Sequence, residues 1–189
     1  IGKLSARAGT GAACSVAAMF RLPAIPSFRT SAGSPRSAEG GANGARGSDN
    51  TPIASVERAK ILSDGSLGPW QIENYLTTPR RGTKAIVHGN YIYAIGGYNG
   101  AFLRSIERAE VHVDGSLSEW SLEYEQANID RYIHSATIFR DNIYLLGGHV
   151  HNDSKVSYGD VEMSHINTNG TLAPWVVEKT ILQNPRFIA

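Results

Sequence analysis

The sequence predicts an all-β chain built from a repeated unit of four short strands. Three observations predict it. Several residue patterns return in the same order at a period of about 50 residues. Within each period, short β-rich runs are closed by turn residues such as Asp-Gly and Gly-Gly. No segment shows a convincing helical period of apolar residues.

The period is fixed by five landmarks. Trp70, Trp120 and Trp175 are separated by 50 and then 55 residues. The pattern Ser-Val-Glu-Arg at 55–58 returns as Ser-Ile-Glu-Arg at 105–108 and loosely at 160–163. Asp-Gly-Ser-Leu at 64–67 returns at 114–117 and, as Asn-Gly-Thr-Leu, at 169–172. The remaining landmarks are the double glycines Gly96-Gly97 and Gly147-Gly148, and the arginines Arg80, Arg131 and Arg186. Five landmarks in one order at one period indicate a repeat.

Each strand of the unit has its own signal. The first covers 84–88 and, one period on, 135–139, and a polar pair follows it. The second, 91–95 and 142–146, is a continuous apolar run that suits a strand covered on both faces and ends at the double glycine. The third covers 105–113. Asp114-Gly115 is a strong hairpin turn into the fourth, which carries Leu117, Trp120 and Leu122.

The chain divides into a head and a repeat region. Residues 1–50 contain 26 Gly, Ala or Ser residues and no Trp or Tyr, so we expect them to be unstructured and to make no stable contact with the repeats. Residues 51–189 form the repeat region, with units at about 53–104, 105–159 and an incomplete 160–189.

Composition excludes some classes of function. The formal net charge is +1, which argues against a nucleic-acid-binding surface. No apolar run reaches the roughly 18–20 residues that span a bilayer. Cys14 is the only cysteine, so no disulfide within the chain can stabilise the fold.

The order of these signals resembles the kelch repeat, over about residues 53–189. The closest stretch runs from Thr78-Pro79-Arg80 to the double glycine and Tyr98-Asn99-Gly100. Kelch repeats usually place Tyr after Glu-Arg, whereas this chain has Ala59, Ala109 and Ser164 there. The resemblance implies a partial β-propeller of about two and a half four-stranded antiparallel blades. Closed propellers have about four to eight blades, so we expect the blades to be completed by further blades in cis or by self-association.

The variable loops predict where a ligand would bind. In an antiparallel blade, the loop after the second strand and the link to the next blade share one edge, and here these segments vary in length and sequence. Variable loops on a rigid scaffold usually carry binding. The candidate ligand-binding residues on this edge are Arg80, Arg81, Tyr98, Asn99, Arg131, His134, His149, His151 and Arg186.

The arginines have two interpretations. The resemblance implies that arginines at such positions line a pocket for acidic peptides, for which bidentate carboxylate recognition suits Arg. Alternatively, an arginine that recurs once per blade bonds neighbouring loop carbonyls or the Glu of the Glu-Arg pair, and we favour this structural interpretation for Arg80, Arg131 and Arg186. Arg81 is the better ligand candidate, because Tyr132 takes its place in the next unit.

The histidines and tryptophans also have plain interpretations. His149 and His151 are two residues apart, with Asp153 and His134 nearby, as strand-adjacent zinc ligands would be, but we favour polar loop residues on a wet surface and predict no metal or cofactor. The tryptophans recur once per blade, so we predict that Trp70, Trp120 and Trp175 are equivalent core residues. The recurrent glycines are likewise predicted to be structural: Gly96, Gly97, Gly147 and Gly148.

Catalytic motifs are absent from the sequence. The leading hypothesis is therefore a non-catalytic module of a larger kelch propeller that binds a protein or peptide through the variable loops. The alternative is a fragment of a propeller enzyme that acts on carbohydrate, epimerase-like or oxidase-like.

Overall fold

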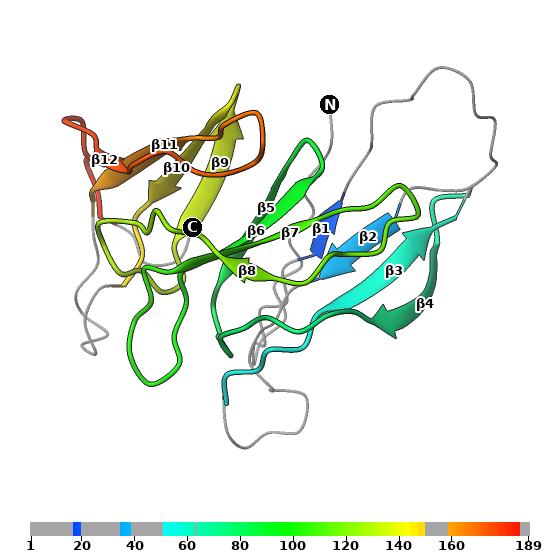
Figure 1. Ribbon diagram of the computed structural model, residues 1–189. Coiled ribbons are helices and arrows are strands. Elements are labelled where there is room, and N and C mark those ends of the chain that lie inside the picture. The colour runs from blue at the N-terminus through cyan, green and yellow to red at the C-terminus, as the bar shows by residue number, and fades with distance from the viewer. Residues whose placement is uncertain (1–16, 20–34, 39–50, 63, 150–158, 186–189) are drawn as a thin grey trace.

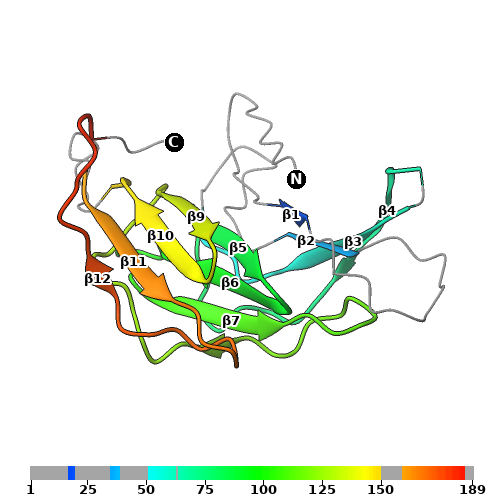
Figure 2. The same ribbon diagram turned by 90° about the horizontal axis from the view of Figure 1, so that it is seen from above.

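The computed structural model describes residues 17–19, 35–38, 51–62, 64–149 and 159–185. These residues form three antiparallel sheets of four strands each, which lie side by side (Figures 1 and 2). The strands follow chain order within each sheet, and no helix occurs in the described ranges. The all-β fold class, as partial propeller blades, is confirmed.

The middle sheet consists of β5 (Lys84–His88), β6 (Tyr91–Ile95), β7 (Ile106–Glu110) and β8 (Ser121–Leu122). The strand β6 lies between β5 and β7, and all but its first residue are buried. This placement explains its continuous apolar sequence. The tight turn from β5 to β6 uses Gly89 at a φ of 55°.

The third sheet repeats this arrangement with β9 (Ser135–Phe139), β10 (Asn142–Leu146), β11 (Val161–His165) and β12 (Val176–Val177). Tyr144 of β10 pairs with Thr137, as Tyr93 of β6 pairs with Ile86. Arg140 takes the place of Gly89 and adopts the same φ of 55°, which is uncommon for a residue with a side chain. The backbone of the repeat is therefore more constant than its sequence.

The first sheet differs from the expectation for residues 1–50. Its strands lie in the order β1 (Ala17–Met19), β2 (Pro35–Ala38), β3 (Glu57–Ile61) and β4 (Leu67–Ile72), and β2 pairs antiparallel with β3. The head thus contributes two strands, and the expectation of no stable contact was wrong for them. Composition indicates how much apolar surface a segment can bury. It does not indicate whether the segment can pair its backbone with a neighbouring strand, as β2 does with the edge of β3. The rest of residues 1–50 lies outside the described residues.

The unit boundaries also need correction. The sheets span 84–122 and 135–177, so the boundaries expected at 104 and 159 cut through them. The strands β11 and β12 complete the sheet that β9 and β10 begin, and they do not start an incomplete blade. A sequence repeat fixes the period but not the point in the period at which one sheet ends.

Two apolar cores lie between successive sheets. The first joins Val56 and Leu76 of the first blade to the middle blade and includes Trp120. The second joins Tyr93, Ile106 and Ala127 to the third blade and includes Trp175. Each core is therefore shared by two blades, so that neighbouring blades stabilise one another.

The three tryptophans are not equivalent in burial. Trp120 and Trp175 are buried as predicted, with exposed fractions of 4% and 7%. Trp70 is 45% exposed, so the prediction was wrong for this residue. The buried tryptophans are covered by the blade that precedes them in the chain, and no sheet precedes the first one in the described part of the chain.

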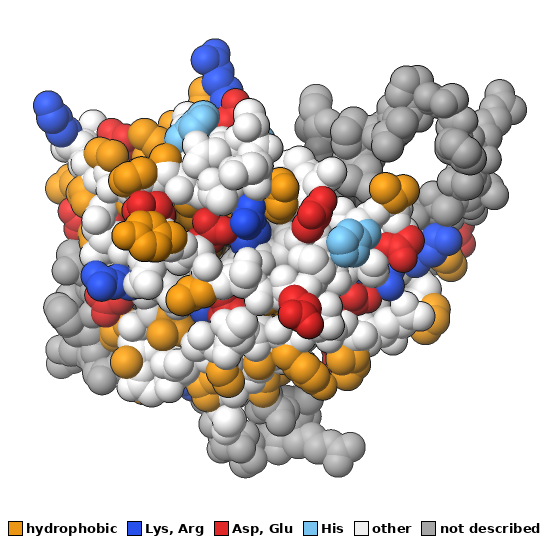
Figure 3. Space-filling model, in the orientation of Figure 1, with side chains coloured by type: hydrophobic (Ala, Val, Ile, Leu, Met, Phe, Trp, Pro, Cys, Tyr) orange, Lys and Arg blue, Asp and Glu red, His pale blue; other side chains and the backbone are white. Residues whose placement is uncertain are grey.

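The molecular surface is mixed in charge. In Figure 3, acidic side chains are spread over the middle of the visible face, hydrophobic side chains follow its lower rim, and basic side chains are scattered. Within the described ranges, no helix is long and apolar enough to cross a membrane.

Candidate functional site

The site lies at the end of the sheets where the long loops connect the strands. We call this end the loop edge. Strands β5, β7 and β9 begin at this edge, and β6 and β10 end there. The loop after β6 and the link from β8 to β9 therefore meet on it. The opposite edge carries the short hairpin turns at 89–90, 114–115 and 140–141.

Arg80 is buried on this edge and bonds the protein itself. One terminal nitrogen donates to the backbone oxygens of Gly96, at 2.7 Å, and Ser105, at 3.1 Å. The other lies 2.7 Å from a carboxylate oxygen of Glu107, and neither side chain is exposed. Glu107 also accepts hydrogen bonds from the backbone nitrogens of Thr77 and Thr78. This cage ties the link before β5 to the sheet.

Arg131 makes equivalent contacts to the double glycine and the glutamate one blade later. Its Nη1 donates to the Gly147 oxygen at 2.5 Å, and its Nε lies 3.1 Å from Glu162, which also accepts from the Asn128 backbone nitrogen. Both arginines thus contact loop carbonyls and the glutamate at the Glu-Arg position of the repeat, as the structural interpretation expects. Because both are buried, neither is placed to receive a ligand in this structure. Arg186 lies outside the described residues.

The double glycine is needed where the blades meet. Gly96 and Gly97 have φ values of 61° and 105°, a backbone region that favours glycine. A Cβ on Gly96 would lie 2.7 Å from the Arg131 oxygen, and one on Gly97 would lie 2.9 Å from the Arg81 oxygen. The Gly97 nitrogen donates to the Arg131 oxygen at 2.8 Å. The glycines therefore permit close backbone contact beside the variable residues.

Two backbone pairs present those variable residues. Arg81 and Tyr98 exchange hydrogen bonds of 3.0 and 2.9 Å between their backbone groups, and Tyr132 and His149 exchange bonds of 3.1 and 2.9 Å. Tyr132 follows Arg131 as Arg81 follows Arg80, and His149 follows its double glycine as Tyr98 does. Each blade thus holds the same two positions in one geometry, and the two blades fill them with different side chains.

The side chains of these pairs form one group, which we call the Arg81 cluster: Arg81, Tyr98, Phe102, Tyr132 and His149. The guanidinium carbon of Arg81 lies 4.7 Å from the Tyr98 ring centroid and 5.6 Å from that of Tyr132. Phe102 stacks on Tyr132 at 5.9 Å and meets the edge of Tyr98 at 5.6 Å. The ring of His149 lies 6.3 Å from that of Tyr132.

The cluster combines a cation with an aromatic surface. Arg81, Tyr98, Phe102 and Tyr132 are partly exposed, whereas His149 is buried. A guanidinium over aromatic rings keeps its charge and its planar donors while the rings limit its motion. Such a group can bind a carboxylate and at the same time cover an apolar side chain of a ligand.

His134 is buried between two blades and does not lie on a wet surface. It is 1% exposed, and a Cβ on Gly96 or Gly148 would lie within 3 Å of its side chain. Neither ring nitrogen has a hydrogen-bond partner among the described residues. Burial, with smaller contributions from Arg131 and Lys84, lowers the pKa of His134 from 6.5 to about 3. In this structure it is therefore a neutral interior residue and not a surface one.

The surface interpretation was also wrong for His149, which is buried. Asn99 is exposed on the loop after β6, next to the cluster. His151 and Asp153 lie outside the described residues. No group of three or more His, Cys, Asp or Glu side chains that could hold a metal ion occurs among the residues that are described.

Two members of the cluster, Phe102 and Tyr132, were not among the sequence candidates. A signal for Tyr132 was present, since it occupies the position of Arg81 in the next unit. Positions next to a recurrent residue that do not themselves recur are the ones free to change with a ligand. Phe102 had no such signal, because it lies in a loop that differs in length between the units.

Comparison with known families agrees with this architecture. Residues 79–108 match the model of the Kelch motif, from the residue before Arg80 to Arg108 in β7. No curated protein matches the chain significantly. The matched segment contains Arg80, the double glycine and Glu107, which together build the buried cage on the loop edge. Residues 79–108 thus carry a Kelch motif, in a chain whose described residues form three four-stranded antiparallel sheets like partial propeller blades.

Proposed function

We propose that this chain is a non-catalytic binding module that takes a protein or peptide ligand at the Arg81 cluster. The observation that carries the proposal is the placement of Arg81 over Tyr98 and near Tyr132, on the edge with the variable loops. Kelch repeats usually mediate protein interaction, which agrees with this function. Nothing in the described part of the chain favours the carbohydrate-enzyme alternative.

The chemistry of the cluster selects a class of ligand. The planar guanidinium of Arg81 suits a carboxylate, which it can bind through two parallel hydrogen bonds. The rings of Phe102 and Tyr132 suit an aromatic or aliphatic side chain next to that carboxylate. We therefore expect a peptide segment in which Asp or Glu stands beside a large apolar residue. Tyr and Arg are the residue types in which binding energy concentrates at protein interfaces.

The test is selection of peptides from a displayed random library, followed by fluorescence anisotropy with the best labelled peptide. We expect selected peptides to share an acidic residue. Replacing it with its amide, or replacing Arg81 by Gln, should weaken binding about ten- to a hundredfold. Arg81→Lys should recover only part of the loss, because Lys lacks the planar fork.

Arg140 supplies a matched control. Its guanidinium carbon lies 5.4 Å from the Phe139 ring centroid, so it is also an arginine over an aromatic ring, but at the hairpin on the opposite edge. Arg140→Gln should leave the affinity unchanged. Equal losses in both variants would show that net charge, and not the Arg81 cluster, determines binding.

A further inference from the structure

The two junctions between successive blades have the same construction. At the first, Leu117 and Trp120 of the middle blade share a core with Val56 and Leu76 of the first blade. At the second, Leu172 and Trp175 share a core with Ile106 and Ala127. Each junction thus joins a Leu-Trp pair of one blade to an aliphatic pair of the blade before it.

The first blade also carries a Leu-Trp pair, but in the described part of the chain this pair is not packed on another blade. Leu67 and Trp70 are 41% and 45% exposed, whereas Leu117 and Trp120 are both 4% exposed. These residues stand at the same positions of the repeat, three residues apart after an Asp-Gly-Ser turn. We call Leu67 and Trp70 the tryptophan face. Its exposure follows from its place in the array, because no sheet in the described part of the chain lies before the first blade.

The third blade also carries an aliphatic pair, but in the described part of the chain no Leu-Trp pair packs on it. Its members, Val161 and Leu182, are partly exposed, and we call them the aliphatic face. Backbone hydrogen bonds establish the equivalence. The Glu178 nitrogen donates to the Val161 oxygen at 2.8 Å as that of Glu123 does to Ile106, and the Leu182 nitrogen donates to Gly159 as that of Ala127 does to Arg104.

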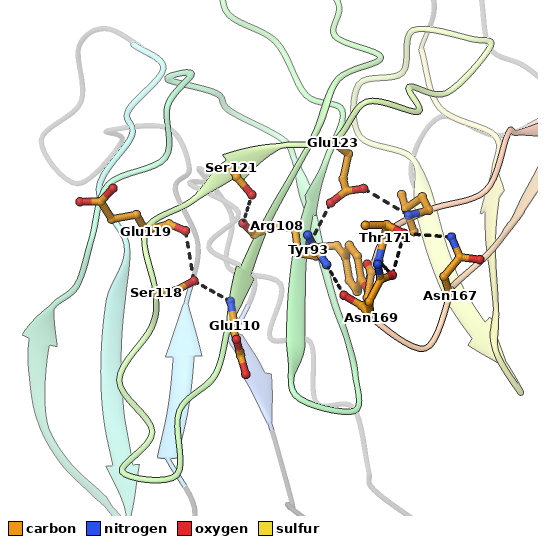
Figure 4. A network of polar contacts seen from close by, with 12 residues as sticks. Tyr93, Arg108, Glu110, Ser118, Glu119, Ser121, Glu123, Asn167, Asn169 and Thr171 are labelled. Atoms are coloured by element: carbon orange, nitrogen blue, oxygen red, sulfur yellow. Dashed lines mark hydrogen bonds and ion pairs between the residues drawn. The ribbon is translucent and has the colours of Figure 1, made fainter.

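Each junction also has an Arg–Glu ion pair on one blade, and its glutamate accepts a hydrogen bond from the next blade. Glu73 pairs with Arg58 at 2.6 Å and accepts from the Leu117 nitrogen at 3.2 Å. Glu123 pairs with Arg108 at 2.7 Å and accepts from the Leu172 nitrogen at 3.2 Å. Figure 4 shows Arg108 and Glu123 directed at the turn that carries Asn169. Glu178 stands at this position on the third blade, where Met163 replaces the arginine.

A tyrosine completes the second junction. The Tyr93 hydroxyl donates to the Gly170 oxygen of the third blade at 2.7 Å and is buried. Its equivalent on the third blade is Tyr144, which is partly exposed. At a third junction of the same kind, Tyr144 would reach the turn at Gly65.

We propose that a second copy of this chain docks head to tail, with the tryptophan face of one copy on the aliphatic face of the other. The chain carries both halves of an interface that it already forms twice within itself, and this continuity identifies the occupant. The contact is heterologous, since the two surfaces differ. The three sheets formed by the described residues of each copy make six, within the four to eight blades of closed rings, so the expected assembly is a closed dimer.

The test is sedimentation velocity on the full chain and on two variants, Trp70→Glu and Leu182→Glu. We expect the wild-type chain to be a dimer and each variant to be a monomer, with association at least about thirtyfold weaker. An equimolar mixture of the two variants should form dimers again, because it contains one intact pair of faces. Tyr124→Glu, at a residue that is 93% exposed, is the control and should leave the dimer unchanged.

Each result decides the proposal. A monomeric wild-type chain at micromolar concentration would overturn it, and so would a mixture that stays monomeric while both variants retain the circular dichroism of the wild type. An assembly unaffected by Trp70→Glu would show that another segment or partner covers the face.

A gain of affinity provides a second measurement that does not depend on damaged variants. Met163→Arg restores the arginine that the other two blades place beside the equivalent of Glu178. It should tighten the dimer by roughly two- to fivefold, the effect of a partly exposed ion pair. In a Glu178→Gln background the same substitution should have no such effect. Equal tightening in both backgrounds would contradict the proposed junction.

Discussion

The carboxylate of Glu107 lies 2.7 Å from the guanidinium of Arg80, and both side chains are fully buried. The pair joins the link before β5 to β7 and fixes the loop edge on which Arg81 stands. Because an unpaired buried charge is costly, Arg80→Met should lower the free energy of unfolding by roughly 3–5 kcal/mol. Urea denaturation measures it. Arg104→Met, at an exposed position of the same edge, should cost within about 0.5 kcal/mol.

Trp120 and Trp70 test whether position in the array of blades determines burial. Trp120→Ala should cost roughly 3–5 kcal/mol, as truncation of a large aromatic residue in a core does. Trp70→Ala, measured at a concentration where the chain is monomeric, should cost about 1 kcal/mol or less. Comparable losses would mean that Trp70 lies in a core of its own.

Tyr93 links the middle and third blades through one hydrogen bond. Tyr93→Phe keeps the ring but leaves the Gly170 oxygen without its buried donor, so it should cost about 1–3 kcal/mol. Tyr124→Phe, at an exposed position, should be neutral. If Tyr93→Phe were equally neutral in urea denaturation, the hydroxyl would not contribute to the junction.

His134 predicts acid sensitivity. Its folded-state pKa of about 3 lies below the ordinary 6.5, so the unfolded chain takes up the proton first as the pH falls. Its contribution to stability is complete above pH 6.5 and is lost progressively toward pH 3, by roughly 1.4 kcal/mol per pH unit. Asp64 and Asp114, whose pKa values are lowered by hydrogen bonds from Ser66 and Ser116, keep their contribution to stability above their ordinary pKa of 3.8 and lose it only as the pH falls below that value.

The variant His134→Thr isolates this effect, because Thr83 occupies the equivalent position and donates to the Ile95 oxygen at 2.9 Å. Between pH 6.5 and 4.5, the unfolding free energy of the variant should fall less steeply than that of the wild type. Parallel curves in urea denaturation would show that His134 is protonated in the folded protein.

The repeat could be predicted from the sequence because each strand of a blade has a local signal. The structural role of Arg80 and Arg131 could be predicted as well, since a residue that recurs in every blade serves the blade. The exposure of Trp70 could not, because it depends on which blade precedes it and not on its own repeat. The burial of His134 depends on contact with the glycines of a neighbouring blade, and the contribution of β2 depends on the backbone edge of β3. Neither leaves a pattern in the sequence.

The most direct test of the account is amide hydrogen exchange of the whole chain with and without the selected acidic peptide. We expect protection at residues 81–82, 98–104 and 131–132, which surround the Arg81 cluster. The turns at 112–116 and 140–141 on the opposite edge should exchange as in the free protein. Protection confined to those turns, with none around Arg81, would contradict the assignment of the loop edge as the binding site.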